Sequence, residues 1–198
     1  MLRVVRAAAR PDAIDCWDHV NPLVRIGPMS AIDLSQPFTI HLGVNEPQFE
    51  RFEDDALMRG MMIFRLDLTG LPDRTALADY LAQEFMYPFR TAGLDAAISL
   101  ISDLEWFGNT NGHLVIARGL ATPSDVGDSF VSILPNITDR WRTQAIPFIV
   151  AIDGKGDRLR SSLQDANDHM EESASLPWAI PGYDEGAVNV VIHGAGHP

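Results

Sequence analysis

The sequence has a single cysteine and no long apolar run, and each shortage excludes a class of protein. Cys16 alone cannot build a disulfide framework, which fits a reducing compartment. No stretch approaches the roughly 18 consecutive apolar residues that a membrane-spanning helix needs. Arg3, Arg6 and Arg10 interrupt the apolar run that a secretion signal would require. We therefore expect a cytoplasmic protein with no membrane partner.

Motifs for catalysis and for phosphate binding are missing as well. The chain contains no G-x-S-x-G elbow and neither of the glycine-rich phosphate loops, G-x-G-x-x-G and G-x-x-x-x-G-K-[ST]. The segment from Asp153 to Asp157 resembles part of a calcium loop, but its ligand spacing and the lack of a closing glutamate favour a turn. We therefore expect no enzymatic activity and no cofactor.

Two pairs of spaced residues, one of which contains the cysteine, form one candidate metal site. Cys16 and His19 make a C-x-x-H pair, and His193 and His197 make an H-x-x-x-H pair near the end of the chain. Together they would supply the four ligands of a structural zinc ion. Two glycines beside the second pair disfavour the helix that would align its rings, so surface and loop positions explain these residues more simply. A metal-dependent enzyme built on them is the third functional alternative.

Charge is the most informative feature of the composition. The chain has 27 acidic residues against 15 basic ones, a formal net charge of −12, and the acids are scattered along it. Such a field repels nucleic acid, whose binding depends on Lys and Arg at the phosphates, so we expect no nucleic-acid partner. The same field attracts a basic protein and speeds its encounter. The simpler interpretation is that the acids only keep the protein in solution.

Apolar patterning predicts an α/β fold. Residues 61–68, 114–117 and 147–152 have the composition of buried strands, and residues 38–44 alternate as a half-buried strand does. Helical spacing predicts two helices between the first two of the buried strands and one before the third. This order predicts a small three-stranded parallel sheet flanked by helices, with extra N-terminal and C-terminal strands and helices.

Capping residues and prolines mark the helices. Pro47 suits a first helical turn before an apolar face of Phe49, Phe52 and Ala56, and Asp73 is expected to cap the next helix. Pro135 lies inside the last predicted helix, where it would kink the helix or divide it in two.

Three parts of the chain are distinguished. Residues 1–60 are an N-terminal elaboration packed on the core, and residues 61–153 are the α/β domain. Residues 154–198 are a C-terminal extension, with a helix through Leu159, Leu163 and Met170 and a late strand at 187–193. This strand is expected to pair either with residues 38–44 or with an edge of the central sheet.

Short motifs between the first two strands of the domain occur in a recognisable order. They are Leu66-Asp67-Leu68 at a strand end, Tyr87-Pro88-Phe89 in a loop, Gly93-Leu94-Asp95-Ala96 at a helix start and Asp103-Leu104-Glu105-Trp106 at a helix end. In this order and spacing, residues 62–153 resemble the barstar family of ribonuclease inhibitors and related immunity-type proteins. The resemblance implies a three-stranded parallel sheet with helices packed on it.

The resemblance also implies a function. A barstar-like immunity protein, the inhibitor in a toxin–antitoxin pair, blocks a basic partner, a toxin ribonuclease, with carboxylates that take the place of substrate phosphates. Transferred to this chain, the partner-binding residues lie in the loop 88–93, on the helix face that follows and on a later helix: Phe89, Arg90, Thr91, Gly93, Asp95, Ser99, Ser102, Asp103 and, by looser alignment, Asp139.

Two positions depart from the family pattern. Arg90 stands in a loop that usually carries tyrosines and an asparagine, and a basic nuclease site would repel it. Ser99 stands where the family places its deepest-reaching carboxylate. The alternative function is therefore a barstar-fold scaffolding or regulatory module whose flanking segments bind a partner that is not a nuclease. Asp95 also has a structural explanation, as an acid favoured by the helix dipole, and Asp103 and Trp106 have one as helix-end and core residues.

Overall fold

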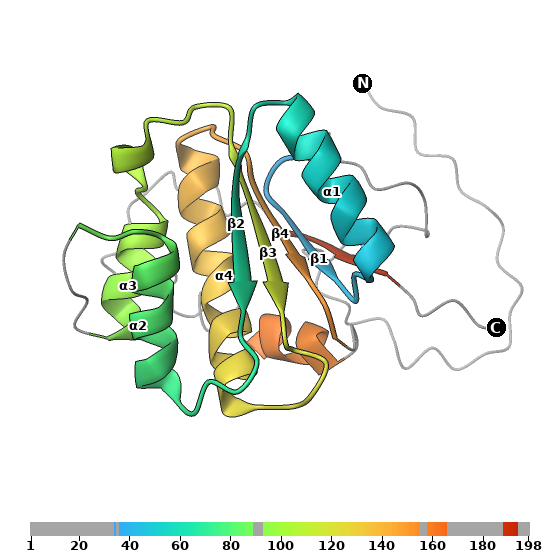
Figure 1. Ribbon diagram of the computed structural model, residues 1–198, viewed down its shortest axis with the longest axis vertical. Coiled ribbons are helices and arrows are strands. Elements are labelled where there is room, and N and C mark those ends of the chain that lie inside the picture. The colour runs from blue at the N-terminus through green and yellow to red at the C-terminus, as the bar shows by residue number, and fades with distance from the viewer. Residues whose placement is uncertain (1–33, 35, 89–92, 155–157, 166–187, 194–198) are drawn as a thin grey trace, which may run out of the picture.

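A parallel β-sheet organises the protein, as a computed structural model shows for residues 34, 36–88, 93–154, 158–165 and 188–193 (Figure 1). Every pairing in the sheet is parallel, and the strand order is β2-β3-β4-β1-β5. The predicted α/β class is confirmed, but among the described residues the sheet has five strands and not three. The strands are β1 (Thr39–Leu42), β2 (Met62–Asp67), β3 (His113–Arg118), β4 (Phe148–Ile152) and β5 (Asn189–Ile192).

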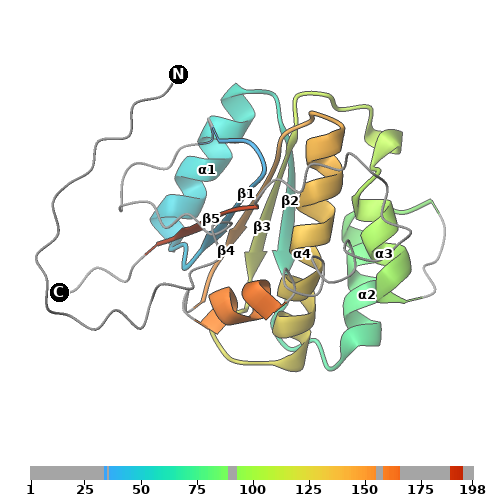
Figure 2. The ribbon, with the colours of Figure 1, turned by 180° about the vertical axis from the view of Figure 1, so that it is seen from behind.

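Helices cover both faces of the sheet (Figures 1 and 2). One helix, α1, packs on one face through an apolar cluster that includes Phe49, Phe52 and Ile116. The remaining helices pack on the other face, where the larger cluster includes Trp141 and Leu159. The helices are α1 (Glu46–Met58), α2 (Arg74–Glu84), α3 (Leu94–Ile101), α4 (Asp125–Thr143), a short 3-10 turn η1 (Glu105–Phe107) and a helix at 158–165.

The position of β1 explains why the three-strand prediction was wrong. β1 pairs with the free edge of β4, so that Ile40 lies beside Val150 and Leu42 beside Ile152. All four residues of β1 are buried, although their alternation predicted a strand with one exposed face. The second face is buried because α1 crosses it on the way from β1 to β2, which lies at the far edge of the sheet. Right-handed crossovers in opposite directions place α1 and the later helices on opposite faces.

The late strand and the helix before it also join this sheet. β5 pairs with β1 and not with an edge of the three predicted strands. In the helix at 158–165, Leu159 and Leu163 are buried as predicted, while Met170 lies outside the described residues.

The two helix-start signals predicted from the sequence, Pro47 and Asp73, are confirmed. Pro47 lies in the first turn of α1, where Asn45 and Gln48 also form a capping box that was not predicted. The carboxylate of Asp73 accepts hydrogen bonds from the backbone N–H groups of Thr75 and Ala76, both at 2.9 Å. Each interaction satisfies N–H groups that the helix itself leaves unpaired.

Helix α4 continues through Pro135 as a single element. The proline is buried, and the residues around it keep the apolar spacing that packs α4 against the sheet. Trp141, near the end of α4, is fully buried and donates its indole N–H to the carbonyl of Ile101 at 2.9 Å. This bond fixes the end of α3 against α4.

Of the four residues of the proposed metal site, the structure describes His193. His193 follows β5 and lies beside His41, with 3.1 Å between Nε2 of His193 and Nδ1 of His41. Cys16, His19 and His197 lie outside the described residues. Within the described ranges no group of three metal-ligating side chains occurs, and none of the helices there is long and apolar enough to cross a membrane.

His113 is a buried polar side chain at the start of β3. It is 1% exposed, and its ring lies 4.6 Å from that of Trp141, centroid to centroid. Neither ring nitrogen has a hydrogen-bond partner among the described residues. Burial lowers the pKa of His113 to about 4, because the apolar surroundings oppose the charged form.

We predict that His113 makes the fold sensitive to acid. Between the unfolded pKa, about 6.5, and the folded value near 4, the unfolded chain binds a proton that the folded chain does not, so stability falls as the pH falls. The loss approaches about 3 kcal/mol at the low end of this window. His113→Phe keeps an aromatic ring and removes the titration, so urea unfolding at pH 7.5 and 4.5 should show a smaller loss than in the wild type. Equal losses in both proteins would contradict the prediction.

Candidate partner-binding surface

The carboxyl edge of the sheet is the usual ligand site of a parallel α/β fold. Ligands bind there where neighbouring strands send their connections to opposite faces. In this protein that change of face occurs between the neighbouring strands β1 and β4. β1 leads to α1 on one face, and β4 leads to the helix at 158–165 on the other face.

Close backbone contacts fill this edge among the described residues. Gly43, Gly119 and Gly154 follow three adjacent strands, each with positive φ, and a Cβ at any of them would lie 2.6 Å from a backbone atom of the neighbouring loop. Only glycine permits this approach and this conformation. The strand ends are therefore packed against one another where an α/β enzyme would hold its ligand.

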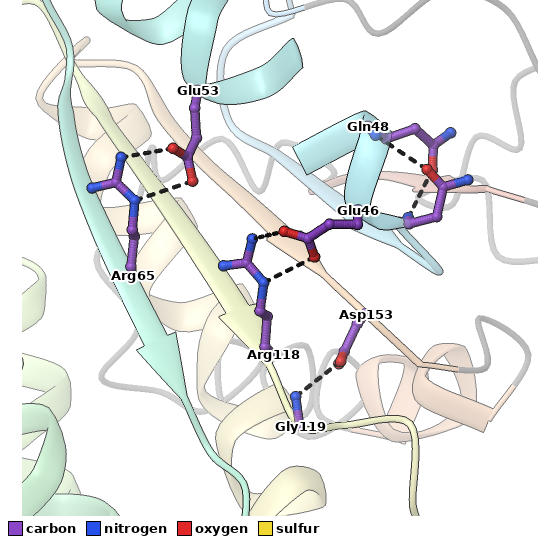
Figure 3. Close-up of polar contacts among 8 residues, drawn as sticks. Glu46, Gln48, Glu53, Arg65, Arg118, Gly119 and Asp153 are labelled. Carbon is purple, nitrogen blue, oxygen red and sulfur yellow. Dashed lines mark hydrogen bonds and ion pairs between the residues drawn. The ribbon is translucent and has the colours of Figure 1, made fainter. Parts of the chain in front are cut away.

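Carboxylates satisfy the donors at the same edge (Figure 3). Asp153 accepts hydrogen bonds from the backbone N–H groups of Gly119 at 2.9 Å and Leu120 at 2.8 Å. The carboxylate of Glu46 accepts hydrogen bonds from two guanidinium nitrogens of Arg118, from Nη2 at 2.6 Å and from Nε at 3.2 Å. These hydrogen bonds lower the pKa of Glu46. Arg118 is thus neutralised by the chain's own carboxylate, which leaves it a weak attractant for a phosphate.

A second ion pair ties α1 to the edge strand. Glu53 and Arg65 form a bidentate pair at 2.7 and 3.1 Å across the face of β2 (Figure 3). Arg65 is 53% exposed in its side chain, so solvent screens this pair strongly.

We predict that Asp153 contributes more to stability than Glu53 does. Asp153→Ala leaves two backbone N–H groups between β3 and β4 without their acceptor, which costs about 2–3 kcal/mol. Glu53→Ala removes a screened surface pair and costs less than about 1 kcal/mol. Urea unfolding of both variants measures the difference, and similar losses would show that the Asp153 hydrogen bonds are replaced by solvent.

The residues predicted from sequence to bind a partner fall into three groups. Phe89, Arg90 and Thr91 lie outside the described residues. Asp139 lies on α4 and pairs with Arg142, and its side chain is only 13% exposed. The others belong to α3 and its two ends: Gly93, Asp95, Ser99, Ser102 and Asp103.

Helix α3 presents three of these residues on one exposed side. Asp95, Ser99 and Asp103 are spaced by four residues and are all exposed. Gly93 precedes the helix with φ 113°, a conformation that only glycine adopts readily. Ser102 does not belong to this side: it is 3% exposed and donates its hydroxyl to the carbonyl of Ile98.

The exposed carboxylates of α3 have no ion-pair partner among the described residues. Asp95 lies in the first helical turn, where the dipole favours an acid, which is the structural role anticipated from sequence. Ser99 donates its hydroxyl to the backbone carbonyl of Asp95 at 3.3 Å. Asp103 follows the last turn, where the helix dipole disfavours an acid, so the dipole does not account for its presence there.

Two exposed apolar side chains adjoin α3, and sequence reasoning missed both. Trp106 was interpreted as a core residue but is 36% exposed, and Met86 is 65% exposed. The rings of Tyr87 and Trp106 meet edge to face with centroids 5.7 Å apart. We call Met86, Tyr87 and Trp106 the Met86–Trp106 patch. The D-L-x-W motif predicted that this tryptophan lies at a helix end. Its exposure was not predicted, because it depends on the position of η1 relative to the rest of the fold.

Met86 has an unfavourable backbone conformation. It follows α2 with φ 46°, in the left-handed region that costs a non-glycine residue about 1 kcal/mol or more. The conformation ends the helix: the N–H of Met86 donates to the carbonyl of Gln83, and the N–H of Tyr87 donates to that of Ala82, as in a Schellman motif.

We predict that Met86→Gly raises the free energy of unfolding by about 0.5–1 kcal/mol, because glycine relieves the strain. Gly93→Ala, which places a Cβ at φ 113°, should lower it by at least a similar amount. Thermal unfolding of both variants gives the two signs, and a destabilised Met86→Gly would show that the Met86 side chain contributes more packing than strain.

Comparisons with known proteins assign no family to this α/β protein. No family model matches the chain, and no curated protein matches it. Among solved structures it is similar to a chain in the structure of Drosophila ORC bound to DNA, with a TM-score of 0.40 and 10% identity over 63% of this chain and 75% of that one. A chain in the structure of Drosophila ORC bound to AT-rich DNA and Cdc6 has a TM-score of 0.39 and 12% identity over 65% of this chain and 46% of that one. Similarities this low carry no functional argument.

Proposed function

We propose that this protein is a binding protein that blocks a basic protein partner, a toxin ribonuclease, through the exposed side of α3 and the loop before it. The observation that carries the proposal is the pair of exposed carboxylates on α3, Asp95 and Asp103, neither of which has a cationic partner among the described residues. Carboxylates on a rigid helix suit a site that binds phosphate with arginine, lysine and histidine.

Charge around α3 supports the same partner. Residues 74–107 contain more acids than bases: Asp79, Glu84, Asp95, Asp103 and Glu105 against Arg74 and Arg90. The whole chain has a net charge of −12, so a basic protein is attracted at long range.

The surface is also held in place before binding. Tyr87 donates its hydroxyl to the carbonyl of Ala97 at 3.1 Å, which ties the start of the loop to α3. Trp141 binds the carbonyl of Ile101 at the other end of the helix. A surface that is rigid beforehand loses less conformational entropy when it binds.

The packed carboxyl edge of the sheet supports a non-enzymatic role. The described strand ends contact one another through glycines, and Asp153 and Glu46 satisfy donors that would otherwise face a ligand. The acidic surface of α3 lies away from this edge and has exposed side chains of the kind that a protein partner contacts.

Ser99 favours the second candidate, a scaffolding or regulatory module. It is exposed in the centre of the α3 surface, with its hydroxyl directed to its own helix backbone. A serine there supplies no charge to a nuclease site, so a partner that is not a nuclease remains the alternative.

The proposal predicts a partner that depends on the α3 carboxylates. The full chain and the double variant Asp95→Asn/Asp103→Asn are used in parallel to capture proteins from producing cells at low salt. We expect a basic protein whose ribonuclease activity the wild type suppresses on titration. The double variant should suppress it at least about tenfold more weakly, as expected for close charge pairs at an interface.

The matched control is Glu50→Gln/Asp54→Asn, which removes the same charge from exposed positions on α1, across the sheet. It should inhibit like the wild type. A captured basic protein without ribonuclease activity that still depends on α3 would favour the scaffolding alternative. If no basic protein distinguishes the double variant from the control, the proposed surface is wrong.

A further inference from the structure

The Met86–Trp106 patch lies directly beside the proposed surface. The indole N–H of Trp106 donates to the carbonyl of Phe85 at 3.3 Å, and its ring contacts that of Tyr87, so Trp106 spans the segment that contains Met86. The hydroxyl of Tyr87 in turn donates a hydrogen bond to the carbonyl of Ala97 in α3. The patch and the exposed side of α3 therefore form one connected region.

The polar groups of the two aromatic residues are already in use. The Trp106 N–H and the Tyr87 hydroxyl both donate to backbone carbonyls of the chain. Burial raises the pKa of Tyr87, so its phenol stays neutral. What remains for a partner is the exposed part of the indole ring, together with the thioether chain of Met86, and neither offers a hydrogen bond.

Two acids lie near this aromatic surface. Asp103 is exposed and lies three residues before Trp106, just after α3, and Glu84 precedes Phe85, whose carbonyl accepts the Trp106 indole N–H. An aromatic face attracts cations, and neighbouring carboxylates add to the attraction. A planar, weakly hydrated guanidinium stacks on such a ring better than a compact ammonium does.

From this arrangement we infer that the partner is anchored by an arginine side chain that stacks on Trp106, beside Met86, with Asp103 as its counter-ion. The inference rests on the proposed function in one respect, since it assumes a basic protein partner at this surface. It adds the anchoring residue and the chemistry of the group that it receives. Tryptophan and arginine are frequent anchors at protein interfaces.

The test uses short peptides that carry one positive charge each, so that the long-range attraction of the negatively charged protein does not dominate binding. Acetyl-Gly-Arg-Gly-amide and acetyl-Gly-Lys-Gly-amide are titrated into the full ¹⁵N-labelled chain, and the indole N–H signals are followed by NMR. We expect a saturable shift of the Trp106 signal with the arginine peptide, and about threefold weaker binding of the lysine peptide. The buried Trp141 is the internal control and should not shift.

Variants separate stacking from charge. Trp106→Leu should weaken the arginine peptide about two- to fivefold and abolish its preference over lysine, whereas Asp103→Asn should weaken both peptides alike. Glu50→Gln on α1 is the control for charge and should change neither. Thermal unfolding checks that Trp106→Leu is folded, and the wild-type Trp106 shift tests the inference without any variant.

The two proposals fail separately. If the Trp106 signal moves no more than that of Trp141, or the arginine preference survives Trp106→Leu, the arginine anchor is wrong even when a ribonuclease is captured through α3. If the peptide results hold and no ribonuclease is captured, the arginine site stands and the ribonuclease assignment fails.

Discussion

The pairing of β1 with β4 is the contact on which the rest of the structure depends. It joins the first strand of the chain to the fourth, and Ile40 and Leu42 become fully buried through it. Because β2 lies at the far edge, the chain must cross one face of the sheet as α1 and return along the other face. The same pairing gives β5 the edge on which it docks. The two apolar layers and the change of face between β1 and β4 follow from it.

The carboxyl edge of the sheet and the exposed side of α3 have different properties. At the carboxyl edge, glycine backbones pack closely, and Asp153 and Glu46 satisfy N–H and guanidinium donors. Beside α3, in contrast, Asp95 and Asp103 stay in solvent next to a partly exposed indole. An acidic surface with an exposed aromatic residue offers the charge and contact area that protein recognition uses.

Local patterns predicted the elements well because their causes lie within a few residues. The capping carboxylate of Asp73, Pro47 in the first turn of α1 and the apolar spacing of α1 each depend on neighbours within one or two turns. The partner-binding positions on α3, in contrast, were transferred from the resemblance to the barstar family. Ser102 was misplaced because its neighbours on α4 and in the following loop, and not its spacing alone, decide which side of α3 is buried.

By itself the sequence determined the α/β class, the acidic character, the helices with their caps and the candidate side of α3. Only the tertiary structure decided that residues 39–42 are buried on both faces, that the sheet has five strands, and that Trp106 is exposed. The physical reason is the range of the interactions. Helical periodicity and capping act within a segment, whereas the partner of a strand and the exposure of a side chain depend on which distant segment covers them.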